Sequence, residues 1–471
     1  MKWIEDTWAG LIFCLHAAGA VHALHALMKN RTSQGAIAWI LFLITFPYVA
    51  VPLYWFFGRD KFTGYVRARR AKDGKLADKS RDVREAIKRY KVRQHSSLMK
   101  TASHLAGLPH ISGNALTLYT DGEKTFHEIF ATIEKAEHYI LLNYYIFKND
   151  TVGEAMQEML VRKARAGVRV YFLYDEIGSS KLPRAFLREM RDAGVEFHHF
   201  GTNRFWWSRF QYNFRNHRKI IICDGKEALI GGLNVADEYL GWHPTLGYWR
   251  DTHMKICGPA VLAIQLVFVE DWYWACGAAI DLQYRVTESG EQSILILPTG
   301  PADVLDSWQL LIVEASNQAR ERLWIASPYF VPDTGVTSAL QAAALRGVDV
   351  RILLPDRGDN LLVHFATYCY YQPIMDAGGA IYRYTKGFLH QKVLLSDNAA
   401  CVGTGNVDNR SFRLNFEIAG FTEDEGFVRS VREMLEEDFL GAYLAKAGDY
   451  TDQPWYFRAA CRGAKLFSPL L

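Results

Sequence analysis

Two long runs of apolar residues open the chain. Neither residues 7–28 nor residues 35–58 contain an Asp, Glu, Lys or Arg, and only the six residues KNRTSQ lie between them. Each run reaches the roughly 20 apolar residues that a helix needs to cross a bilayer. The pattern therefore predicts a hairpin of two transmembrane helices, with the second helix kinked at Pro47 and Pro52.

Other interpretations of these runs stay open. The first run could be a signal peptide, because AGA near Ala18 resembles a cleavage site, although Glu5 and Asp6 are unusual at the start of one. The second run would still anchor the chain after cleavage, unless it is a buried core helix. Histidines are costly in lipid, so we expect those of the first run to form a polar packing seam rather than a metal site (His16, His22 and His25).

A basic segment follows the second run. In residues 59–93, Lys and Arg outnumber Asp and Glu by about three to one, whereas the loop between the runs holds only Lys29 and Arg31. The positive-inside rule therefore predicts that the large C-terminal part lies in the cytoplasm. The segment is either attracted to anionic lipid headgroups or simply a solvated helix, and the two interpretations are compatible.

From about Leu116 onwards, apolar strand-like stretches alternate with longer amphipathic stretches, which is typical of an α/β fold. The pattern also occurs twice, at an offset of about 180 residues. Three stretches of the first half have counterparts in the second: 138–147 in 321–333, 166–180 in 346–360, and 192–200 in 376–384. We therefore expect a tandem duplication packed about a pseudo-two-fold axis.

The domain organisation that this pattern predicts has four parts. They are a transmembrane hairpin at 1–60 with helices at about 7–28 and 35–58, a basic juxtamembrane linker at 61–110, a first repeat at 111–290, and a second repeat with a C-terminal tail at 291–471.

Composition adds little to this picture. Aromatic residues make up 14% of the chain, which suits a membrane interface, and the net charge of +3 does not by itself indicate a nucleic-acid partner. The seven cysteines contain no CxxC pair, so we expect neither a disulfide framework nor a zinc site. Reduced thiols are consistent with a cytoplasmic location.

The candidate chemistry lies in two histidine-bearing stretches, at 213–234 and 387–406. Alternate residues of a strand share a face, so His217 and Lys219 point the same way, as do His390 and Lys392. Two such copies in a repeat can bring two imidazoles and two ammonium groups to one place. A lone histidine on a strand is usually structural, but two complete copies at matching places indicate a site.

This constellation suits phosphoryl chemistry. Two lysines can seat a phosphate, one histidine can attack phosphorus, and the other can protonate the leaving oxygen, so we expect no metal and no cofactor. Asn234 and Asn406 follow the Gly-rich turns and could donate further hydrogen bonds. Asp251 and Glu417 lie in equivalent downstream segments and could orient the imidazoles, unless they are ordinary surface carboxylates.

The most specific feature is HxK, four further residues and Asp, which occurs twice and ends at Asp224 and Asp397. Gly-Gly or Gly-Thr-Gly and then Asn follow each copy. With the apolar hairpin and the stretches NFRNHRK, SPYFVPD and GFLHQKV, the chain resembles the bacterial cardiolipin synthases of the phospholipase D superfamily. The resemblance covers nearly the whole chain.

The resemblance implies phosphatidyl transfer between two phosphatidylglycerol molecules, giving cardiolipin and glycerol through a phosphohistidine. It implies His217 as nucleophile, His390 as acid and base, and structural roles for Asp224 and Asp397, whereas the residues alone do not rank the two histidines. It also implies a multi-pass protein of the bacterial inner membrane, with anionic lipid as its partner and no nucleic acid. Oligomeric state is not implied. One departure is Asn143, where the family often has Glu.

Several alternatives share these residues. Water as acceptor would make the protein a hydrolytic phospholipase D, and serine would make it a phosphatidylserine synthase. A nuclease would have no evident use for the membrane hairpin. An inactive membrane scaffold would not be expected to keep both motifs intact. Two aromatic and basic stretches could face lipid or pack on the core: 204–214, RFWWSRFQYNF, and 455–471, WYFRAACRGAKLFSPLL.

Overall fold

The structure of the 471-residue chain is a computed structural model, and it describes residues 2–29, 33–58, 75–93, 96–201, 213–282 and 287–471. Most of the aromatic stretch at 204–214 and the first part of the basic segment, residues 59–74, therefore lie outside the described residues, and the predicted lipid contacts of both segments stay predictions.

The N-terminal apolar runs form three helices, α1 (Lys2–Lys29), α2 (Ser33–Thr45) and α3 (Pro47–Phe57). The predicted second helix is therefore divided. Its division falls at Phe46, whose backbone is not helical, and Pro47 begins the next helix without an N–H to continue the previous ladder. Among the described residues, one stretch, Gly10–Lys29, is long and apolar enough to cross a membrane as a single helix.

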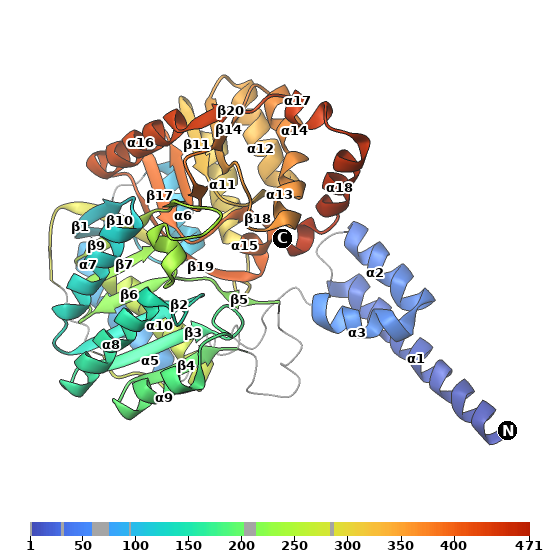
Figure 1. The fold of residues 1–471 in the computed structure, drawn as a ribbon, viewed down its shortest axis with the longest axis horizontal. Helices are drawn as coiled ribbons and strands as arrows, with labels where there is room; N and C mark the ends of the chain where they lie inside the picture. The colour runs from blue at the N-terminus through green and yellow to red at the C-terminus, as the bar shows by residue number, and fades with distance from the viewer. Residues whose placement is uncertain (1, 30–32, 59–74, 94–95, 202–212, 283–286) are drawn as a thin grey trace.

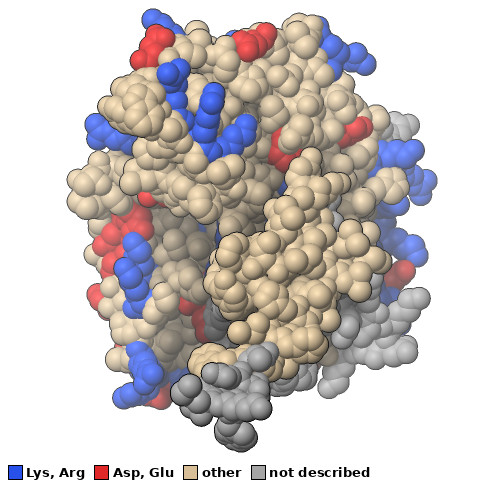
Figure 2. All heavy atoms as spheres, turned by 90° about the vertical axis from the view of Figure 1, so that its right-hand side faces the viewer, with Lys and Arg blue, Asp and Glu red and all other residues tan. Residues whose placement is uncertain are grey.

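These three helices pack on one another. Trp55 Nε1 donates to His22 Nε2 at 2.6 Å, and His25 Nδ1 lies 2.8 Å from the Tyr54 hydroxyl. Two of the predicted seam histidines thus meet aromatic partners on α3. In Figure 1 the three helices stand beside the main body with the start of α1 projecting outward. Figure 2, which looks onto this side, shows them as a surface largely free of charged side chains.

The segment before the first repeat is not merely solvated. It forms α5 (Lys75–Ile87), η1 (Lys88–Tyr90) and α6 (Ser97–Ala106). Val83 and Ile87 of α5 and Met99 of α6 are fully buried in the main hydrophobic core. This part of the predicted linker therefore belongs to the body of the protein.

Each repeat then supplies strands and helices in the same order. The first contains β1 (Ile111–Tyr119), α7 (Gly122–Glu134), β2 (Tyr139–Tyr144), α8 (Thr151–Arg165), β3 (Arg169–Asp175), α9 (Arg184–Asp192), β4 (Glu196–Phe200), β5 (Arg215–Asn216), β6 (Ile220–Cys223), β7 (Glu227–Gly231), η3 (Asp237–Leu240), β8 (Trp249–Arg250), β9 (His253–Cys257) and α10 (Val261–Cys276). The second contains β10 (Gln292–Thr299), α11 (Ser307–Gln318), β11 (Arg322–Ala326), β12 (Phe330–Val331), α12 (Thr334–Leu345), β13 (Asp349–Pro355), α13 (Leu361–Tyr368), α14 (Tyr371–Asp376), β14 (Ala380–Tyr384), β15 (Phe388–Leu389), β16 (Val393–Ser396), β17 (Ala399–Gly403), β18 (Val407–Asp408), α15 (Asn409–Arg413), β19 (Asn415–Thr422) and α16 (Glu425–Leu440). The chain closes with β20 (Ala442–Leu444), α17 (Gly448–Thr451), α18 (Trp455–Lys465) and η4 (Ser468–Leu470).

The strand order confirms the predicted duplication. Most strands lie in one sheet, ordered β20-β14-β13-β11-β16-β17-β19-β10-β1-β9-β7-β6-β2-β3-β4. Outward from the central antiparallel pair of β1 and β10, the same sequence of equivalent strands follows on both sides. The pairings also match, since β2–β3 and β11–β13 are parallel while β2–β6 and β11–β16 are antiparallel. The fold is therefore two α/β repeats related by a pseudo-two-fold at the centre of the sheet (Figure 1).

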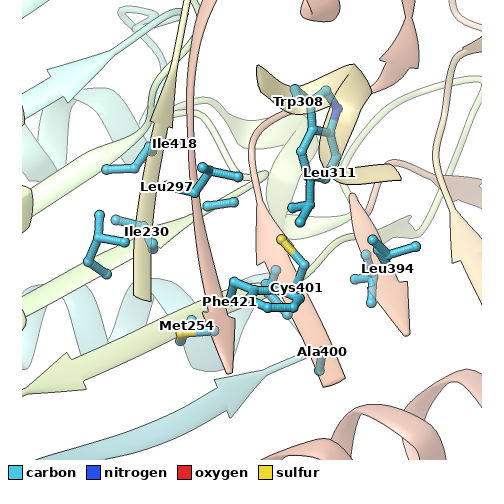
Figure 3. Packing of buried hydrophobic residues seen from close by; sticks show 14 of the residues in the cluster. Ile230, Met254, Leu297, Trp308, Leu311, Leu394, Ala400, Cys401, Ile418 and Phe421 are labelled. Atoms are coloured by element: carbon cyan, nitrogen blue, oxygen red, sulfur yellow. The ribbon is translucent and has the colours of Figure 1, made fainter. Parts of the chain in front are cut away.

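The main core crosses from one repeat to the other. Figure 3 shows Ile230 and Met254 of the first repeat beside Leu297, Ile418 and Phe421 of the second, all of them buried. Burial of this continuous apolar layer, at about 25 cal/mol per Å² of apolar surface, binds the two repeats into one body. All seven cysteines are free thiols.

The C-terminal stretch is docked on the body, as one of the two interpretations of its sequence predicts, and its contact with lipid stays a prediction. Phe457 of α18 packs edge-on against Phe365 and Tyr368 of α13, so one face of the helix docks on the body. Trp455 and Tyr456 remain exposed, with 74% and 64% of their surface accessible.

Candidate active site

A short strand of each repeat pairs with a strand of the other repeat. β5 of the first repeat runs parallel to the start of β19 in the second, and β15 of the second runs parallel to β8 in the first. The ladder continues by one bond in each case, since the N–H of His217 donates to the Phe416 carbonyl at 2.9 Å and that of His390 to the Arg250 carbonyl at 2.7 Å. The first bond holds His217 beside Glu417, and the second holds His390 beside Asp251.

The orienting carboxylates are consequently crossed. His217 Nδ1 lies 2.9 Å from Glu417 Oε2, and His390 Nδ1 lies 2.6 Å from Asp251 Oδ2. All four side chains are buried, with no more than 8% of any residue exposed. Since each Nδ1 faces a carboxylate, Nε2 is the nitrogen left for chemistry on both rings. Asp251 and Glu417 are thus not surface carboxylates.

The histidine and lysine residues lie just ahead of the strands that the sequence places them on. β6 begins at Ile220 and β16 at Val393, so the segments 217–219 and 390–392 are extended connections rather than strand. Their backbones bond to the opposite repeat instead of continuing one ladder. The alternation of side chains still holds, because Arg218 turns away and its Nη1 donates to Asp271 Oδ1 at 2.5 Å.

Glu417 is held by several donors besides His217. Its carboxylate accepts the hydroxyl of Thr404 at 2.6 Å, the hydroxyl of Ser411 at 2.9 Å and the amide of Asn415 at 3.2 Å. A carboxylate with this many donors stays ionised, because each bond favours the charged form. Burial opposes ionisation of Glu417, but its interactions with His217, Lys219 and Thr404 outweigh the burial and lower the pKa of the carboxyl group.

Asp251 reaches His390 through a gap that glycine leaves open. A Cβ on Gly232 would stand 2.0 Å from Asp251 Oδ1, so any side chain there would displace the carboxylate. The same carboxylate accepts the N–H of Thr252 at 2.7 Å. Gly232 occupies the place in the first repeat that Thr404 occupies in the second. The Gly-rich turns thus shape the site differently in the two repeats.

Each motif lysine folds back onto the backbone carbonyl of the histidine in its own motif. Lys219 Nζ donates to the His217 carbonyl at 2.7 Å, and Lys392 Nζ donates to the His390 carbonyl and lies 3.0 Å from His390 Nδ1. Burial lowers the pKa of Lys219 to about 7 and that of Lys392 to about 8, while nearby carboxylates oppose the shift. An anion bound here would raise both pKa values and so favour the charged ammonium forms.

The histidines are also kept neutral by burial. The pKa of His217 falls to about 4 and that of His390 to about 3, chiefly through desolvation, against the raising effect of Glu417 and Asp251. Lys392 lowers the pKa of His217, and Lys219 lowers that of His390, so charges act across the pseudo-two-fold. The arrangement brings two neutral imidazoles and two cations together in one low-dielectric place.

Asp224 and Asp397 lie at the opposite ends of their strands from the histidines. The Asp224 carboxylate accepts the N–H groups of Glu137, His138 and Tyr139, each at 2.8 Å. Asp397 does the same for residues 320–322, at 2.8 to 3.0 Å. Both aspartates have positive φ, 53° and 45°. Each fixes the start of the neighbouring strand, β2 or β11, which is a structural position.

The two asparagines are not equivalent. Asn234 is engaged within its own repeat, since its carbonyl accepts the Ile146 N–H at 3.1 Å and its amide donates to the Tyr239 hydroxyl at 2.5 Å. The side-chain oxygen of Asn406 is buried and has no hydrogen-bond partner among the residues that the structure describes. A half-turn of that amide would present its NH₂ group instead. Asn406 is therefore the better placed of the two for a ligand.

Two buried carboxylates, one for each motif, accept hydrogen bonds from the residues that neighbour the motif histidines. Asp271 accepts from Arg218 and Asn216 in the first repeat, while Asp438 accepts from Gln391 and Arg250 at 2.7 to 2.8 Å on the other side. Asn143, the departure noted in the sequence, also donates to Asp271, at 3.3 Å. An amide therefore fits this position, because it can donate to Asp271, whereas a Glu would place a second carboxylate against it.

Aromatic rings distinguish the surroundings of the two histidines. His390 has Trp249, Tyr239 and Phe388 within 5.9 Å, measured between ring centroids. His217 has Tyr145 at 5.0 Å, and Lys219 Nζ lies 5.5 Å from the same ring. No sequence motif predicts these rings or the donors to Glu417. The available signal was position alone, since Trp249 lies two residues from Asp251 and Thr404 two residues from Asn406.

Within the described ranges, no group of three or more His, Cys, Asp or Glu residues is arranged to hold a metal ion. The side chains of the site provide a nucleophile, a proton donor and acceptor, and fixed cations. That set is sufficient for displacement at a phosphodiester through a covalent intermediate.

Comparison with known proteins identifies relatives along the whole chain. A family model described as cardiolipin synthase, PLD-like domain, matches residues 129–243 and 312–439, and one described as phospholipase D-nuclease N-terminal matches residues 17–59. Proteins named cardiolipin synthase A are 43% identical in Pseudomonas putida and 42% identical in Pseudomonas entomophila. Each alignment spans 470 residues and 98% of this chain, with 97% and 98% of the respective relative.

A solved structure shares the fold. The crystal structure of phosphatidylserine synthase from Haemophilus influenzae superposes with a TM-score of 0.61 over 80% of this chain and all of that one. The two sequences are 14% identical, so the likeness concerns the fold alone.

Proposed function

The chain belongs to the cardiolipin synthase family of the phospholipase D superfamily, and from this premise we propose that it transfers a phosphatidyl group from one phosphatidylglycerol to another. The products are cardiolipin and glycerol. The observation that carries the proposal is the crossed pair of imidazoles, each with Nδ1 on a buried carboxylate of the opposite repeat and Nε2 left to react. This arrangement supports a two-step displacement at phosphorus.

In the first step His217 Nε2 attacks the phosphorus of the donor lipid. The P–N bond forms as the P–O bond to the headgroup glycerol breaks, and His390 gives its proton to the departing glycerol oxygen. Glu417 stabilises the positive charge that His217 acquires when it becomes phosphorylated. The carboxylate is 2.9 Å from the ring nitrogen and needs no rearrangement, because Thr404 and Ser411 already fix it.

In the second step the terminal hydroxyl of the acceptor lipid attacks the phosphohistidine. Neutral His390 takes the hydroxyl proton, the new P–O bond forms and the P–N bond breaks, which returns both histidines to their starting states. Asp251 stabilises the imidazolium form of His390 in each cycle. Burial disfavours protonation of His390, and the phosphate anion of the bound donor lipid raises its proton affinity. His390 therefore carries on Nε2, when the donor is bound, the proton that it gives to glycerol in the first step.

Lys219 and Lys392 stabilise the negative charge on the phosphoryl oxygens. Both ammonium groups are buried beside carbonyls of the motif backbone, so their positions are fixed before the substrate arrives. Fixed cations in a low-dielectric site stabilise a transition state with little reorganisation.

The protein is membrane-associated, and the finer topology is part of the proposal. We infer that it is a multi-pass protein of the bacterial inner membrane with the catalytic body in the cytoplasm. The long apolar helix at Gly10–Lys29 and the paired apolar helices α2 and α3 support this topology, as does the basic composition of residues 59–93. Phosphatidylglycerol in the same leaflet would supply both donor and acceptor.

A lipid assay tests the proposed function. Purified protein is incubated with phosphatidylglycerol vesicles, beside His217→Ala and His390→Ala variants, and lipids are measured by mass spectrometry. Cardiolipin and free glycerol are expected in equal amounts from the unsubstituted protein alone. Phosphatidic acid in place of cardiolipin would show that water is the acceptor and refute the transferase assignment.

A further inference from the structure

A third cation shares the face of the first motif. Arg215, His217 and Lys219 alternate along one extended segment, so their side chains project to the same side. Two residues of extended chain span about 7 Å, which places the Arg215 backbone one step from the reacting imidazole. The motif itself does not include this arginine, and the two-step chemistry above leaves it unused.

A second guanidinium lies against the same segment. Arg410 of α15 donates to the Asn213 carbonyl at 2.8 Å and to the Asn213 side-chain oxygen at 3.2 Å. The next residue of its helix is Ser411, whose hydroxyl holds Glu417. Arg410 therefore reaches the chain just before Arg215 from the opposite repeat.

Within the described part of the chain, neither arginine forms an ion pair with an Asp or Glu side chain. Every hydrogen bond that either guanidinium makes there goes to a carbonyl oxygen, as in the 2.8 Å bond from Arg215 to the Phe214 carbonyl. Asp175, the buried acid whose charge acts most strongly on Arg215, already accepts three backbone N–H groups at 3.0 Å. Both side chains are partly buried.

The two guanidiniums repel one another. Burial lowers the pKa of Arg215, Asp175 and Glu176 oppose the shift, and Arg410 adds to it. Both guanidiniums also act on the phenol of Tyr145, the ring that packs on His217 at 5.0 Å. The pair thus borders the reacting histidine, and guanidinium groups bind phosphate through paired N–H donors.

The proposed reaction requires a second phosphate beside the reacting one. The acceptor phosphatidylglycerol carries its own phosphodiester, and in cardiolipin the two phosphates are joined by a single glycerol. We propose that Arg215 and Arg410 bind the non-reacting phosphate of the acceptor lipid, so that its terminal hydroxyl is aligned with His217 and His390. This inference rests on the proposed function and concerns which alcohol the phosphohistidine accepts.

An internal competition between two acceptors tests the subsite. Vesicles of phosphatidylglycerol are supplied with isotopically labelled glycerol, which can also accept the phosphatidyl group and regenerates labelled phosphatidylglycerol. Glycerol carries no phosphate, so its transfer needs the donor site but not the proposed subsite. The ratio of cardiolipin formation to label exchange therefore reports acceptor binding and does not depend on the amount of folded enzyme.

We expect Arg215→Gln and Arg410→Gln to lower this ratio by about tenfold or more, the effect of removing one charge-assisted hydrogen bond, and Arg215→Lys to recover part of it. Arg188→Gln, the same substitution at an exposed position of α9, should leave the ratio unchanged. An unchanged ratio in Arg215→Gln, or an equal fall in both products, would overturn the subsite. If the unsubstituted protein exchanges label but forms no cardiolipin, the proposed function fails as well.

Discussion

Glu417→Gln tests the crossed pairing of histidine and carboxylate. The substitution keeps the size of the side chain and removes one negative charge 2.9 Å from His217 Nδ1. Two unit charges about 4 Å apart interact by about 4 kcal/mol at an effective dielectric constant of 20. The amide oxygen of Gln can still accept the Nδ1 proton, which retains about 1–2 kcal/mol. A net loss of about 2–3 kcal/mol corresponds to a fall in kcat of roughly 100-fold.

The assay is a single turnover, with glycerol release from phosphatidylglycerol followed by rapid quenching. Since Glu417 stabilises the charge on His217 during phosphorylation, the first release of glycerol should slow, rather than the later transfer alone. Glu433→Gln, the same change at an exposed position of α16, is the matched control. If Glu417→Gln releases glycerol within about threefold of the unsubstituted rate, with an unchanged Tm, the carboxylate does not serve His217 and the reasoning is wrong.

Three further substitutions separate structure from chemistry. Asp224→Ala removes the acceptor of three backbone N–H groups and should lower the free energy of unfolding by about 2–4 kcal/mol in a denaturant titration, while kcat per folded molecule changes little. Gly232→Ala should abolish most activity by displacing Asp251, whereas Gly463→Ala, with no atom within 4 Å of the new methyl group, should not; equal cardiolipin yields would contradict this. The pKa of Lys219 is lowered to about 7 in the folded state from an ordinary 10.5, so the unfolded chain binds more protons than the folded chain between these pH values. Stability therefore rises with pH across that window. Lys219→Met should flatten this rise of Tm with pH. A Tm profile identical to that of the unsubstituted protein would show that folding does not lower the pKa of Lys219.

The repeat and the two motifs could be predicted from sequence because they depend on local order. HxK with an apolar run behind it recurs at matching places, and the sheet order then shows the pseudo-two-fold that this recurrence predicts. The apolar length of the first helix is likewise a property of the sequence itself. These features require no knowledge of which segments meet.

The crossing of the carboxylates could not be predicted in the same way. Asp251 and Glu417 were selected as orienting groups by position, but their partners depend on β5 and β15 each pairing with the opposite repeat. Such pairings are set by tertiary packing rather than by periodicity. For the same reason the sequence placed His217 on a strand, although the chain there bonds across the repeats and β6 begins three residues later.

The difference between the two Gly-rich turns of the site could not be predicted from the sequence either. A Gly-Gly and a Gly-Thr-Gly turn look alike as turns, yet Gly232 makes room for a carboxylate and Thr404 donates to one. The division of the second apolar run had a visible cause in Pro47, but proline predicts either a kink or a break, and Phe46 takes the non-helical backbone that makes it a break.

Identification of the residue that carries the phosphatidyl group would show whether His217 is the nucleophile. The protein would be mixed with phosphatidylglycerol vesicles, quenched during turnover, digested and analysed by mass spectrometry, beside His217→Ala and His390→Ala variants. We expect a phosphatidyl adduct on the peptide that contains His217, and no such adduct in His217→Ala. An adduct on His390 would reverse the two roles, and cardiolipin formation without an adduct on either histidine would contradict the covalent mechanism.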